Sequence, residues 1–436
     1  MNTGITAARL VLTNGATEEE VPLGVVTGRD AKNVGLTTGG LREKHDVFFL
    51  DSGFSNTGIH SAVTYIDGDK GELWYRGYPI RVLAQNCSYL EVAWLLRNGR
   101  LPTGPELQKY VGAVDAFRTV PTELSNFLAS APGKTHPMSI LSMAFSALSG
   151  IYPQHLAVDQ PDSAMAIAMG HMPSLVAIAN CRQFAKRFDP TSAANCPFEE
   201  SFLPLLWGPG RTPTTEQLSA LRVLLILHAD HEQNCSTSSV RMVGSSLANL
   251  FASITAGMNA LWGPAHGGAN EAVRLMFDQI LERGLTADQV VSAAKEKRLK
   301  VLIGYERLMG FGHRVYKNCD PRANLLRELA TTLLQKAGGS KLFDLALKLA
   351  ETALSDQYFI ERDLYPNVDF WSGFVYALLD IDPVLWTSMF AYGRLAGWIA
   401  HWDERRLSKA PIDRPWQLYN GPELNRPFIQ MSDRAS

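Results

Sequence analysis

Residues 309–339 read MGFGHRVYKNCDPRANLLRELATTLLQKAGG, a glycine-rich loop that passes directly into a helical pattern. Apolar side chains in its second half recur three and four residues apart, at Leu325, Leu326, Leu329, Leu333 and Leu334. This spacing gives a helix one apolar face, which it buries against a neighbour. Gly338-Gly339 ends the pattern, because glycine readily takes the left-handed conformation that follows a helix. The stretch therefore predicts a packed helix behind a polar loop.

The helical pattern continues on both sides of this stretch. Apolar residues at helical spacing occur in residues 89–96, 105–120, 137–187, 342–354 and 388–402. Thr286 and Gln289 have the spacing of a capping box, which would start a helix through Arg298. Residues 188–215 are rich in Pro, Gly and Ser and are predicted to form a loop. The chain is thus predicted to be mainly α.

The first 75 residues differ from the rest. They are rich in Gly, Thr, Val and Asp, and their apolar runs are short. Asp67–Gly71 has the composition of a turn between two extended segments, 62–66 and 72–75. Residues 1–75 are therefore predicted to form a small β-rich region.

Composition excludes several classes of protein. Of the 436 residues, 46% are hydrophobic and 19% charged, which is typical of a folded globular chain, and the formal net charge is −2. No excess of positive charge predicts binding to nucleic acid or to a membrane surface. The five cysteines are widely spaced without a C-x-x-C pair, so neither a disulfide framework nor a structural zinc site is expected. A reduced, cytoplasmic setting fits this cysteine usage.

Two segments could be mistaken for targeting or membrane signals. The N-terminus has no basic region followed by a long apolar stretch, so no secretory signal is predicted. Residues 242–270 contain no Asp, Glu, Lys or Arg, but Ser, Asn and Gly-Pro interrupt them. We interpret this segment as a buried helix built from small residues rather than as a membrane span.

The first candidate functional segment is 227–234, LHADHEQN, at the end of an apolar run. Polar groups in such a place need partners if they are buried. His228 and His231 are three residues apart and could share a helical face, so they could bind a metal, form a hydrogen-bonded core pair or contact a ligand. No third metal ligand is evident, and the motif H-E-x-x-H is absent.

Two further histidines stand between glycines. His266 lies in WGPAHGGAN at 262–270, where glycine would allow a ligand to approach the backbone closely. A structural role for it is equally compatible with the residues. His313 lies in the loop of 309–322, where Arg314, Lys317 and Arg322 follow within ten residues. This loop is either a solvated basic segment or a site for carboxylate or phosphate.

Two isolated charged residues complete the set. Asp369 stands among aromatic residues in PNVDFWSG, where burial would disfavour its charged form and suit it to act as a base. It could equally cap the helix that follows. Arg394 lies in the apolar run FAYGRLAGWI and needs an anionic partner, either an acidic side chain or a substrate carboxylate.

Together these strings resemble the citrate synthase family. The segments 228–234, 263–270, 312–322 and 367–370 match family segments in the same order, and 65–68 and 75–80 fit as well. The likeness runs from about residue 45 to residue 422, and its wording is most similar to the bacterial type II branch. It implies a citrate synthase-like two-domain helical fold. A large domain would comprise 76–271 and 381–436, and a small domain, 272–380, would close over the active site.

The resemblance also implies a reaction, the condensation of acetyl-CoA with oxaloacetate to give citrate and CoA. Asp369 would remove a methyl proton from acetyl-CoA, and His266 would stabilise the enolate by a hydrogen bond to the thioester oxygen. His313 would polarise the ketone of oxaloacetate. The family needs no metal and no cofactor for these steps, and acetyl-CoA is a substrate.

Ligand-binding residues follow from the same resemblance. It assigns the carboxylates of oxaloacetate to His231, Arg322, Arg394 and Arg414. The last, in RPWQLY at 414–419, would reach into a neighbouring subunit, so at least a dimer is expected, and a hexamer of dimers fits the type II branch. The phosphates of CoA are expected at Arg307, Arg314 and Lys317. Residues 115–118 and 203–206 do not match the NADH site of some type II relatives, so weak or absent NADH inhibition is expected.

Three alternatives stay open. A 2-methylcitrate synthase, which uses propionyl-CoA, would share all the catalytic residue types, and one methyl group gives only about 1–3 kcal/mol of discrimination. A metal-dependent hydrolase would use His228 and His231. A non-catalytic binding protein of the same fold is the third.

Overall fold

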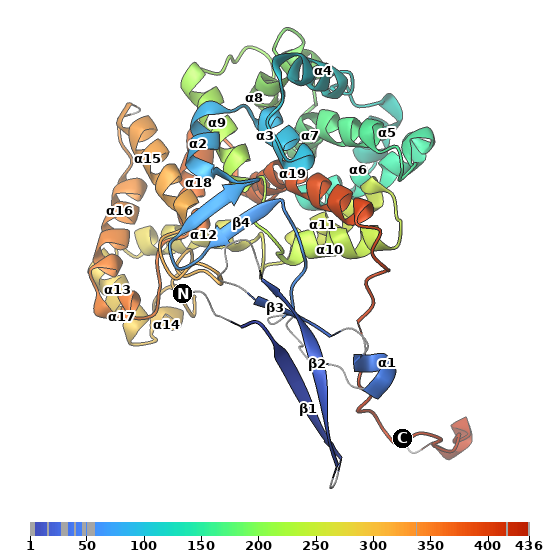
Figure 1. The fold of residues 1–436 in the computed structure, drawn as a ribbon. Helices are drawn as coiled ribbons and strands as arrows, with labels where there is room; N and C mark the ends of the chain where they lie inside the picture. Colours follow the sequence, from blue (N-terminus) through green and yellow to red (C-terminus); the bar gives the residue numbers. More distant parts are fainter. Residues whose placement is uncertain are drawn as a thin grey trace. The chain divides into compact units, whose positions relative to one another are not determined.

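The computed structural model describes residues 5–14, 17–27, 34–38, 41–45, 49, 57–336, 338–415 and 417–434 (Figure 1). The chain divides into two units. The smaller unit combines Met1–His60 with Arg414–Ser436, and the larger unit is Ser61–Asp413. All the predicted site residues except Arg414 therefore belong to the larger unit.

The smaller unit contains a three-stranded antiparallel sheet in the order β1-β2-β3. Its elements are the strands Ala8–Asn14 (β1), Thr17–Thr27 (β2) and Val34–Thr37 (β3), the helix Leu41–His45 (α1) and a 3-10 turn at Met431–Asp433. The β1–β2 hairpin pairs Ala8 with Leu23 and Asn14 with Thr17. The extended structure predicted near the N-terminus is thus confirmed for these residues.

A second small sheet opens the larger unit, in the order β4-β5-β6. Its strands are Thr64–Asp67 (β4), Glu72–Tyr75 (β5) and Tyr78–Pro79 (β6). Thr64 pairs with Tyr75 and Asp67 with Glu72, so the turn falls where the sequence predicted it. The larger unit begins at Ser61, so this hairpin belongs to the same unit as the helices.

Helices build the rest of the larger unit, which confirms the prediction of a mainly α fold. They are Ile80–Asn86 (α2), Tyr89–Asn98 (α3), Gly104–Asp115 (α4), Thr122–Ala129 (α5), Pro137–Ile151 (α6), Asp162–Gln183 (α7), Phe202–Trp207 (α8), Thr215–His228 (α9), Cys235–Ser245 (α10), Leu250–Leu261 (α11), Ala269–Glu282 (α12), Ala287–Lys295 (α13), Leu299–Ile303 (α14), Pro321–Lys336 (α15), Lys341–Leu354 (α16), Gln357–Ile360 (α17), Val368–Leu378 (α18) and Trp386–Leu407 (α19). Short 3-10 turns lie at Pro153–His155, Pro190–Ala193, Phe198–Glu200 and Pro383–Leu385. The division into large and small helical domains stays a prediction.

Local signals place several helix ends correctly. The Thr286–Gln289 capping box is present at the start of α13. That helix stops at Lys295 rather than Arg298, because Lys297 takes a φ of +56° and breaks the helical path. After α15, the Gly339 N–H donates to the Leu334 carbonyl at 2.8 Å, as expected of a glycine that ends a helix.

The prediction of a loop over residues 188–215 was partly wrong. This stretch contains α8 and two 3-10 turns. Phe202, Leu203, Leu205 and Leu206 are buried, and their burial outweighs the prolines and glycines around them. Composition alone could not reveal that this short segment lies against the core.

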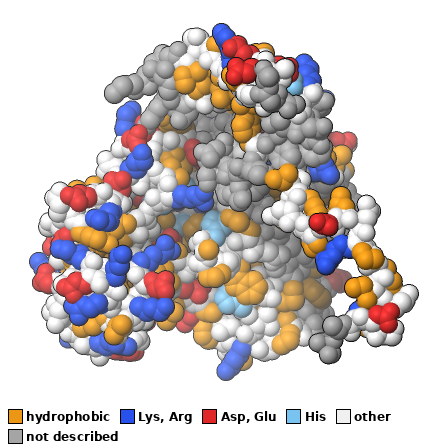
Figure 2. All heavy atoms as spheres, turned by 90° about the horizontal axis from the view of Figure 1, so that it is seen from below, with side chains coloured by type: hydrophobic (Ala, Val, Ile, Leu, Met, Phe, Trp, Pro, Cys, Tyr) orange, Lys and Arg blue, Asp and Glu red, His pale blue; other side chains and the backbone are white. Residues whose placement is uncertain are grey.

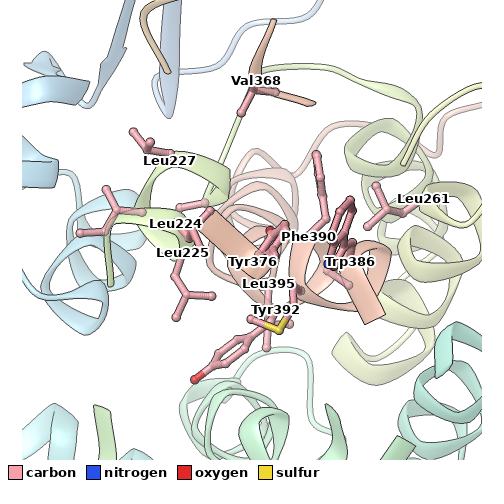
Figure 3. Packing of buried hydrophobic residues seen from close by; sticks show 14 of the residues in the cluster. Leu224, Leu225, Leu227, Leu261, Val368, Tyr376, Trp386, Phe390, Tyr392 and Leu395 are labelled. Carbon is pink, nitrogen blue, oxygen red and sulfur yellow. The ribbon is translucent and has the colours of Figure 1, made fainter. Parts of the chain in front are cut away.

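Helix α19 lies at the centre of the larger unit and contacts α3, α7, α9, α10 and α11. Figure 3 shows Trp386, Phe390 and Tyr392 of α19 packed with leucines of α9 and with Tyr376 of α18. Because α19 touches so many elements, its side chains are held in fixed positions by dense packing. A polar group on this helix therefore has a defined place in the core.

Two glycines of α19 allow the end of α9 to approach closely. A Cβ atom at Gly393 would lie 2.8 Å from the Cβ of His228, and one at Gly397 would lie 2.9 Å from the Cβ of Asp230. The Gly397 N–H donates to the Ala229 carbonyl at 3.0 Å. The segment that follows α9 is consequently fixed against α19.

Among the described residues, one helix is long and apolar enough to cross a membrane. It is α7, and its apolar window is entirely buried inside the protein. The core helix of a folded unit has the same composition. Residues 242–270 form the end of α10, α11, the turn after it and the first two residues of α12, and Leu250, Phe251, Ile254 and Leu261 are buried.

Candidate active site

The segment 229–234, between α9 and α10, carries the candidate site residue His231 and ends at Asn234. Glu232 takes a φ of +52°, which turns the chain toward α10. The Asn234 side-chain oxygen then accepts the Thr237 N–H at 3.1 Å and caps the helix. The segment therefore delivers His231 and the N-terminus of α10 to one place.

The buried carboxylate of Asp230 holds this segment in place. Asp230 accepts the Thr64 hydroxyl at 2.6 Å and lies 3.2 Å from His401 Nε2. Its backbone carbonyl accepts the Tyr75 hydroxyl at 2.8 Å. Burial acts to raise the pKa of Asp230, but His401 and Arg394 keep it below its ordinary value. The charge therefore stays on Asp230, which ties the segment to β4, β5 and α19.

His266 lies in the turn between α11 and α12, against the start of α10. The Ser236 N–H points at His266 Nε2 at 3.3 Å, and the Ser236 hydroxyl oxygen lies 3.0 Å from it. Asn234 Oδ1 is also 3.2 Å from Nε2, but that oxygen already accepts the Ser236 hydroxyl and the Thr237 N–H. Nε2 is therefore an acceptor, and the ring proton of the neutral imidazole is on Nδ1.

The surroundings keep His266 neutral. Burial lowers the pKa of its imidazole to about 4, and the positive charge of Arg394 acts in the same direction. The N-terminus of α10 adds a partial positive charge beside the ring. At neutral pH, His266 is therefore an uncharged N–H donor, which suits an oxygen that gains negative charge during a reaction.

His313 lies in a loop that is bonded to the start of α18. Gly310 and Gly312 take φ values of +78° and +79°, which glycine adopts without strain. The Gly312 N–H donates to the Tyr365 carbonyl at 2.8 Å, and the Asn367 side-chain amide donates to the Gly312 carbonyl at 2.9 Å. These bonds join the His313 loop to the segment that carries Asp369.

Backbone groups also decide which nitrogen of His313 holds the proton. Nδ1 accepts the Val315 N–H at 3.0 Å and the Tyr316 N–H at 3.3 Å. The ring proton is therefore on Nε2. Burial lowers the pKa of His313 to about 4, Arg322 lowers it as well, and Asp320 opposes them. His313 is thus a second neutral N–H donor.

Asp369 is the second residue of α18, and its helix is capped by another residue. Asn367 Oδ1 accepts the Asp369 N–H at 3.0 Å, so the capping role that the sequence left open belongs to Asn367. Burial raises the pKa of the Asp369 carboxyl to about 6, although Arg322 and Arg394 act to lower it. A carboxylate with a pKa near neutrality is an effective general base.

Arg322 forms a buried pair with an acid two residues before it. Its Nε and Nη2 donate to the two oxygens of Asp320, at 3.0 and 2.8 Å. Burial disfavours both charges, but their attraction keeps the pKa of Asp320 below and that of Arg322 above the ordinary value. Bidentate pairing fixes the guanidinium in one orientation.

Arg394, on α19, is buried and only partly satisfied. Its Nε donates to the His228 carbonyl at 2.9 Å, and its guanidinium lies 4.8 Å from the centre of the Phe390 ring. Its Nη1 is buried without a hydrogen-bond partner among the described residues. Burial lowers the pKa of Arg394 to about 10, which leaves it charged. A buried guanidinium N–H without a partner is costly, so the site favours an anionic ligand.

His231 and His228, for which the sequence left open metal binding, a core pair or ligand contact, have different surroundings. His231 Nε2 lies 3.3 Å from the Tyr316 hydroxyl, and its ring centre is 5.2 Å from that of His313. His228 Nδ1 donates to the Leu224 carbonyl of its own helix at 2.8 Å. Among the residues that the structure describes, no group of three or more His, Cys, Asp or Glu side chains could hold a metal ion. The metal-dependent hydrolase is therefore not favoured.

The three candidate CoA-binding residues are on the surface. Arg307, Arg314 and Lys317 are exposed. Lys317 Nζ lies 3.7 Å from Asp69 Oδ1, and both side chains are mostly exposed, so this ion pair is weak. Figure 2 shows one face of the molecule on which basic and acidic side chains are interspersed, without a continuous basic patch among the described side chains.

Arg414, the fourth predicted oxaloacetate residue, is the first residue of the C-terminal part of the smaller unit. Its assignment to a substrate stays a prediction. Trp416, in the same motif, lies outside the described residues.

Several residues that shape the site were given no role by sequence reasoning. They are Asp230, Ser236, Tyr316 and Asp320. A signal existed for Asp320, since an acid two residues before a buried arginine can pair with it. No local signal existed for Asp230, whose partner His401 is 171 residues away in the chain.

Comparison with known proteins places this geometry in context. The family model described as "Citrate synthase, C-terminal domain" matches residues 53–416. Citrate synthase 1 of Mycobacterium tuberculosis is 42% identical over 414 residues, covering 92% of this chain and 94% of that protein. The citrate synthase of Corynebacterium glutamicum is 42% identical over 421 residues, covering 94% and 92%.

A solved structure of a citrate synthase is also similar to this chain. The citrate synthase of Thermoplasma acidophilum, in a ternary complex with carboxymethyl coenzyme A and oxaloacetate, matches with a TM-score of 0.78 and 30% identity. The match covers 88% of this chain and 100% of that one.

Proposed function

The chain belongs to the citrate synthase family, and we propose that His266, His313 and Asp369 carry out the reaction. The enzyme transfers the acyl group of acetyl-CoA to oxaloacetate and makes citrate, the entry step of the tricarboxylic acid cycle. This chemistry needs a base for a weakly acidic methyl group, donors for two oxygens and cations for two carboxylates. The larger unit offers all three.

The first step is removal of a methyl proton from acetyl-CoA. Asp369 takes this proton, since burial brings its pKa to about 6 and so makes it a stronger base than an exposed carboxylate. His266 donates its Nδ1–H to the thioester oxygen as negative charge develops there. A neutral donor suits this role, because its surroundings hold its pKa at about 4.

The second step forms the carbon–carbon bond. The enol carbon attacks the ketone carbon of oxaloacetate, and the carbonyl oxygen becomes an alkoxide. His313 donates its Nε2–H to that oxygen and supplies the proton. Water then hydrolyses the thioester of citryl-CoA, which releases citrate and CoA. The observation that carries this proposal is that backbone N–H groups orient both imidazoles as neutral donors.

Oxaloacetate is held by its carboxylates. Arg394 supports this role, because its buried Nη1 is without a partner among the described residues. Arg322 and His231 lie beside His313, and the ring contact between the two histidines supports a shared ligand. Arg414 would complete the site from a neighbouring subunit. Arg307, Arg314 and Lys317 would contact the phosphates of CoA from the surface.

A homodimer is supported by the surface of α6 and α11. Neither helix contains Asp, Glu, Lys or Arg. A groove of about 550 Å³ runs along them, lined by Phe127, Ser142, Met143, Ser146, Ala147, Thr255 and Asn259. A lack of charged side chains is typical of the core of an interface between two protein chains. A hexamer of such dimers, domain closure over oxaloacetate and a cytoplasmic location are the further parts of the proposal.

The direct test measures CoA release from acetyl-CoA with and without oxaloacetate. We expect release only when oxaloacetate is present, and equal release without it would contradict the proposal. The ratio of kcat/KM for acetyl-CoA and propionyl-CoA separates this enzyme from a 2-methylcitrate synthase. Sedimentation of the pure protein reports its oligomeric state, and a monomer at all concentrations would oppose the shared site. Micromolar NADH should inhibit weakly or not at all.

A further inference from the structure

The β4–β5 turn touches the His313 loop at two glycines. The Lys317 N–H donates to the Gly68 carbonyl at 3.0 Å. A Cβ atom at Gly68 would overlap the Val315 carbonyl oxygen and lie 3.0 Å from its carbon. At the end of the turn, a Cβ atom at Gly71 would lie 2.5 Å from the Cys319 carbonyl oxygen. The loop can approach the hairpin this closely only because both positions lack a side chain.

One peptide group links this contact to the catalytic ring. The Val315 carbonyl faces Gly68, and the N–H of the same peptide group, which belongs to Tyr316, donates to His313 Nδ1 at 3.3 Å. A peptide group is planar and moves as one body. A side chain at position 68 would push the carbonyl and so turn the N–H away from His313. Nδ1 would then keep only the Val315 N–H as a donor, and the imidazole would be held less firmly in its orientation.

The hairpin is itself fixed to the other histidine segment. The Thr64 hydroxyl donates to Asp230 at 2.6 Å, and the Ile66 N–H donates to Glu232 at 3.1 Å. The turn that follows β4 therefore has a rigid base beside His231. It can resist movement of the His313 loop rather than follow it.

We infer that Gly68 and Gly71 are positioning residues, which let the β4–β5 turn hold the His313 loop with Nε2–H aimed at substrate. The inference rests on the proposed function, in which this N–H polarises the ketone of oxaloacetate. It adds the requirement that catalysis depends on the β4–β5 hairpin, which contains none of the proposed catalytic residues. Positions 68 and 71 must both be without a side chain.

Gly68→Ala tests this role, and Gly77→Ala is the matched control. Gly77 lies in the turn between β5 and β6 with a φ of +85°, and a Cβ atom there would meet nothing within 4 Å. We expect Gly68→Ala to lower kcat about 10- to 100-fold, because small misplacements of a catalytic group have effects of this size. Gly77→Ala should change kcat by less than about twofold. The KM for acetyl-CoA should stay the same in Gly77→Ala.

Infrared spectroscopy of bound oxaloacetate distinguishes positioning from general damage. A hydrogen bond from His313 weakens the ketone C=O bond and lowers its stretching frequency. In Gly68→Ala this frequency should move toward its value in water, while in Gly77→Ala it should equal that of the unmodified enzyme. A lowered kcat with an unchanged carbonyl frequency would overturn the inference.

Gly71→Ala keeps the test decisive if Gly68→Ala does not fold. Gly71 and Gly77 both have positive φ, +70° and +85°, so alanine strains the backbone similarly at each. Only Gly71→Ala pushes on the loop, and we expect kcat to fall at least about fivefold below that of Gly77→Ala. Equal kcat and equal carbonyl frequency in these two variants would overturn the inference.

The His313→Gln variant distinguishes a failure of the proposed function from a failure of the role given to the hairpin. If it keeps normal turnover and carbonyl frequency, the proposed function fails. If it loses both while Gly68→Ala and Gly71→Ala behave like Gly77→Ala, only the role of the hairpin fails.

Discussion

The turn of His266 and the loop of His313 each hold a neutral histidine as an N–H donor, but they do so in different ways. Both place a histidine next to glycines, and burial lowers the pKa of both imidazoles to about 4. At His266, however, the ring proton is on Nδ1, because the start of α10 presents the Ser236 N–H to Nε2. At His313 the proton is on Nε2, because the loop presents its own Val315 N–H to Nδ1.

The difference shows that the donor atom is chosen by the backbone around the ring. A separate helix sets the proton of His266, whereas the next residues along the chain set that of His313. The first arrangement depends on tertiary packing of α10 against the turn. The second depends on the shape of one loop, which is why the support of that loop by β4 and β5 matters.

If His266 or His313 were the base, the two histidines would not both act as hydrogen-bond donors. Asp369→Ala should therefore have the largest effect and lower kcat by about 10²- to 10⁴-fold, the usual contribution of a general base. Asp344→Ala removes an exposed carboxylate from α16 and should leave kcat unchanged. Steady-state kinetics measure kcat of both variants, and undiminished citrate formation by Asp369→Ala would contradict the proposed mechanism.

The two donors should also affect different oxygens. His266→Ala and His313→Ala should each lower kcat about 10²- to 10³-fold, the usual cost of losing one such donor. Exchange of the acetyl-CoA methyl protons with solvent, followed by NMR in the presence of an unreactive dicarboxylate, should be lost in His266→Ala and retained in His313→Ala. Equal loss of exchange in both variants would remove the distinction between their roles.

The pH dependence should report the base and not the donors. Asp369 must be ionised to accept a proton, and its pKa is raised to about 6, so kcat/KM should fall about tenfold per unit below pH 6. His266 and His313, with pKa values of about 4, stay neutral across this range. The fall in kcat/KM at low pH should be absent from the residual activity of Asp369→Ala. A fall that persists there would assign the titration to another group.

The smallest effect is expected at the hydroxyl beside His266. Ser236→Ala keeps the backbone N–H that orients the ring, so kcat should fall by no more than about tenfold, the value of one hydrogen bond. Ser239→Ala, on the exposed face of α10, is its control. Nitrogen NMR of labelled histidine should show the proton of His266 on Nδ1 in both variants. Its transfer to Nε2 in Ser236→Ala would mean that the hydroxyl orients the ring.

The sequence predicted those parts of the fold that local spacing determines. The leucines of α15, the Thr286 capping box and the Asp67–Gly71 turn each involve residues only a few positions apart. Steric limits on the backbone act over that distance, so the pattern and the structure agree. The resemblance to a family, rather than the spacing, pointed to the reaction.

Contacts between distant segments could not be predicted in this way. Whether Asp369 caps α18 was open until Asn367 was seen to cap the helix. The partner of Asp230 is His401, and the partner of Gly68 is Val315, which no local pattern indicates. These pairs depend on how helices and the hairpin pack, and packing is a property of the whole unit.

The β4–β5 hairpin also has a consequence for biosynthesis. Gly68 bonds to Lys317, which is about 250 residues later in the chain. A ribosome that adds about 5–20 residues per second needs roughly 10–50 seconds to make that partner. During this time Leu73 and Tyr75, both buried in the finished protein, have only part of their packing. A nascent chain stalled before the His313 loop is therefore expected to be inactive and to expose hydrophobic surface that chaperones bind.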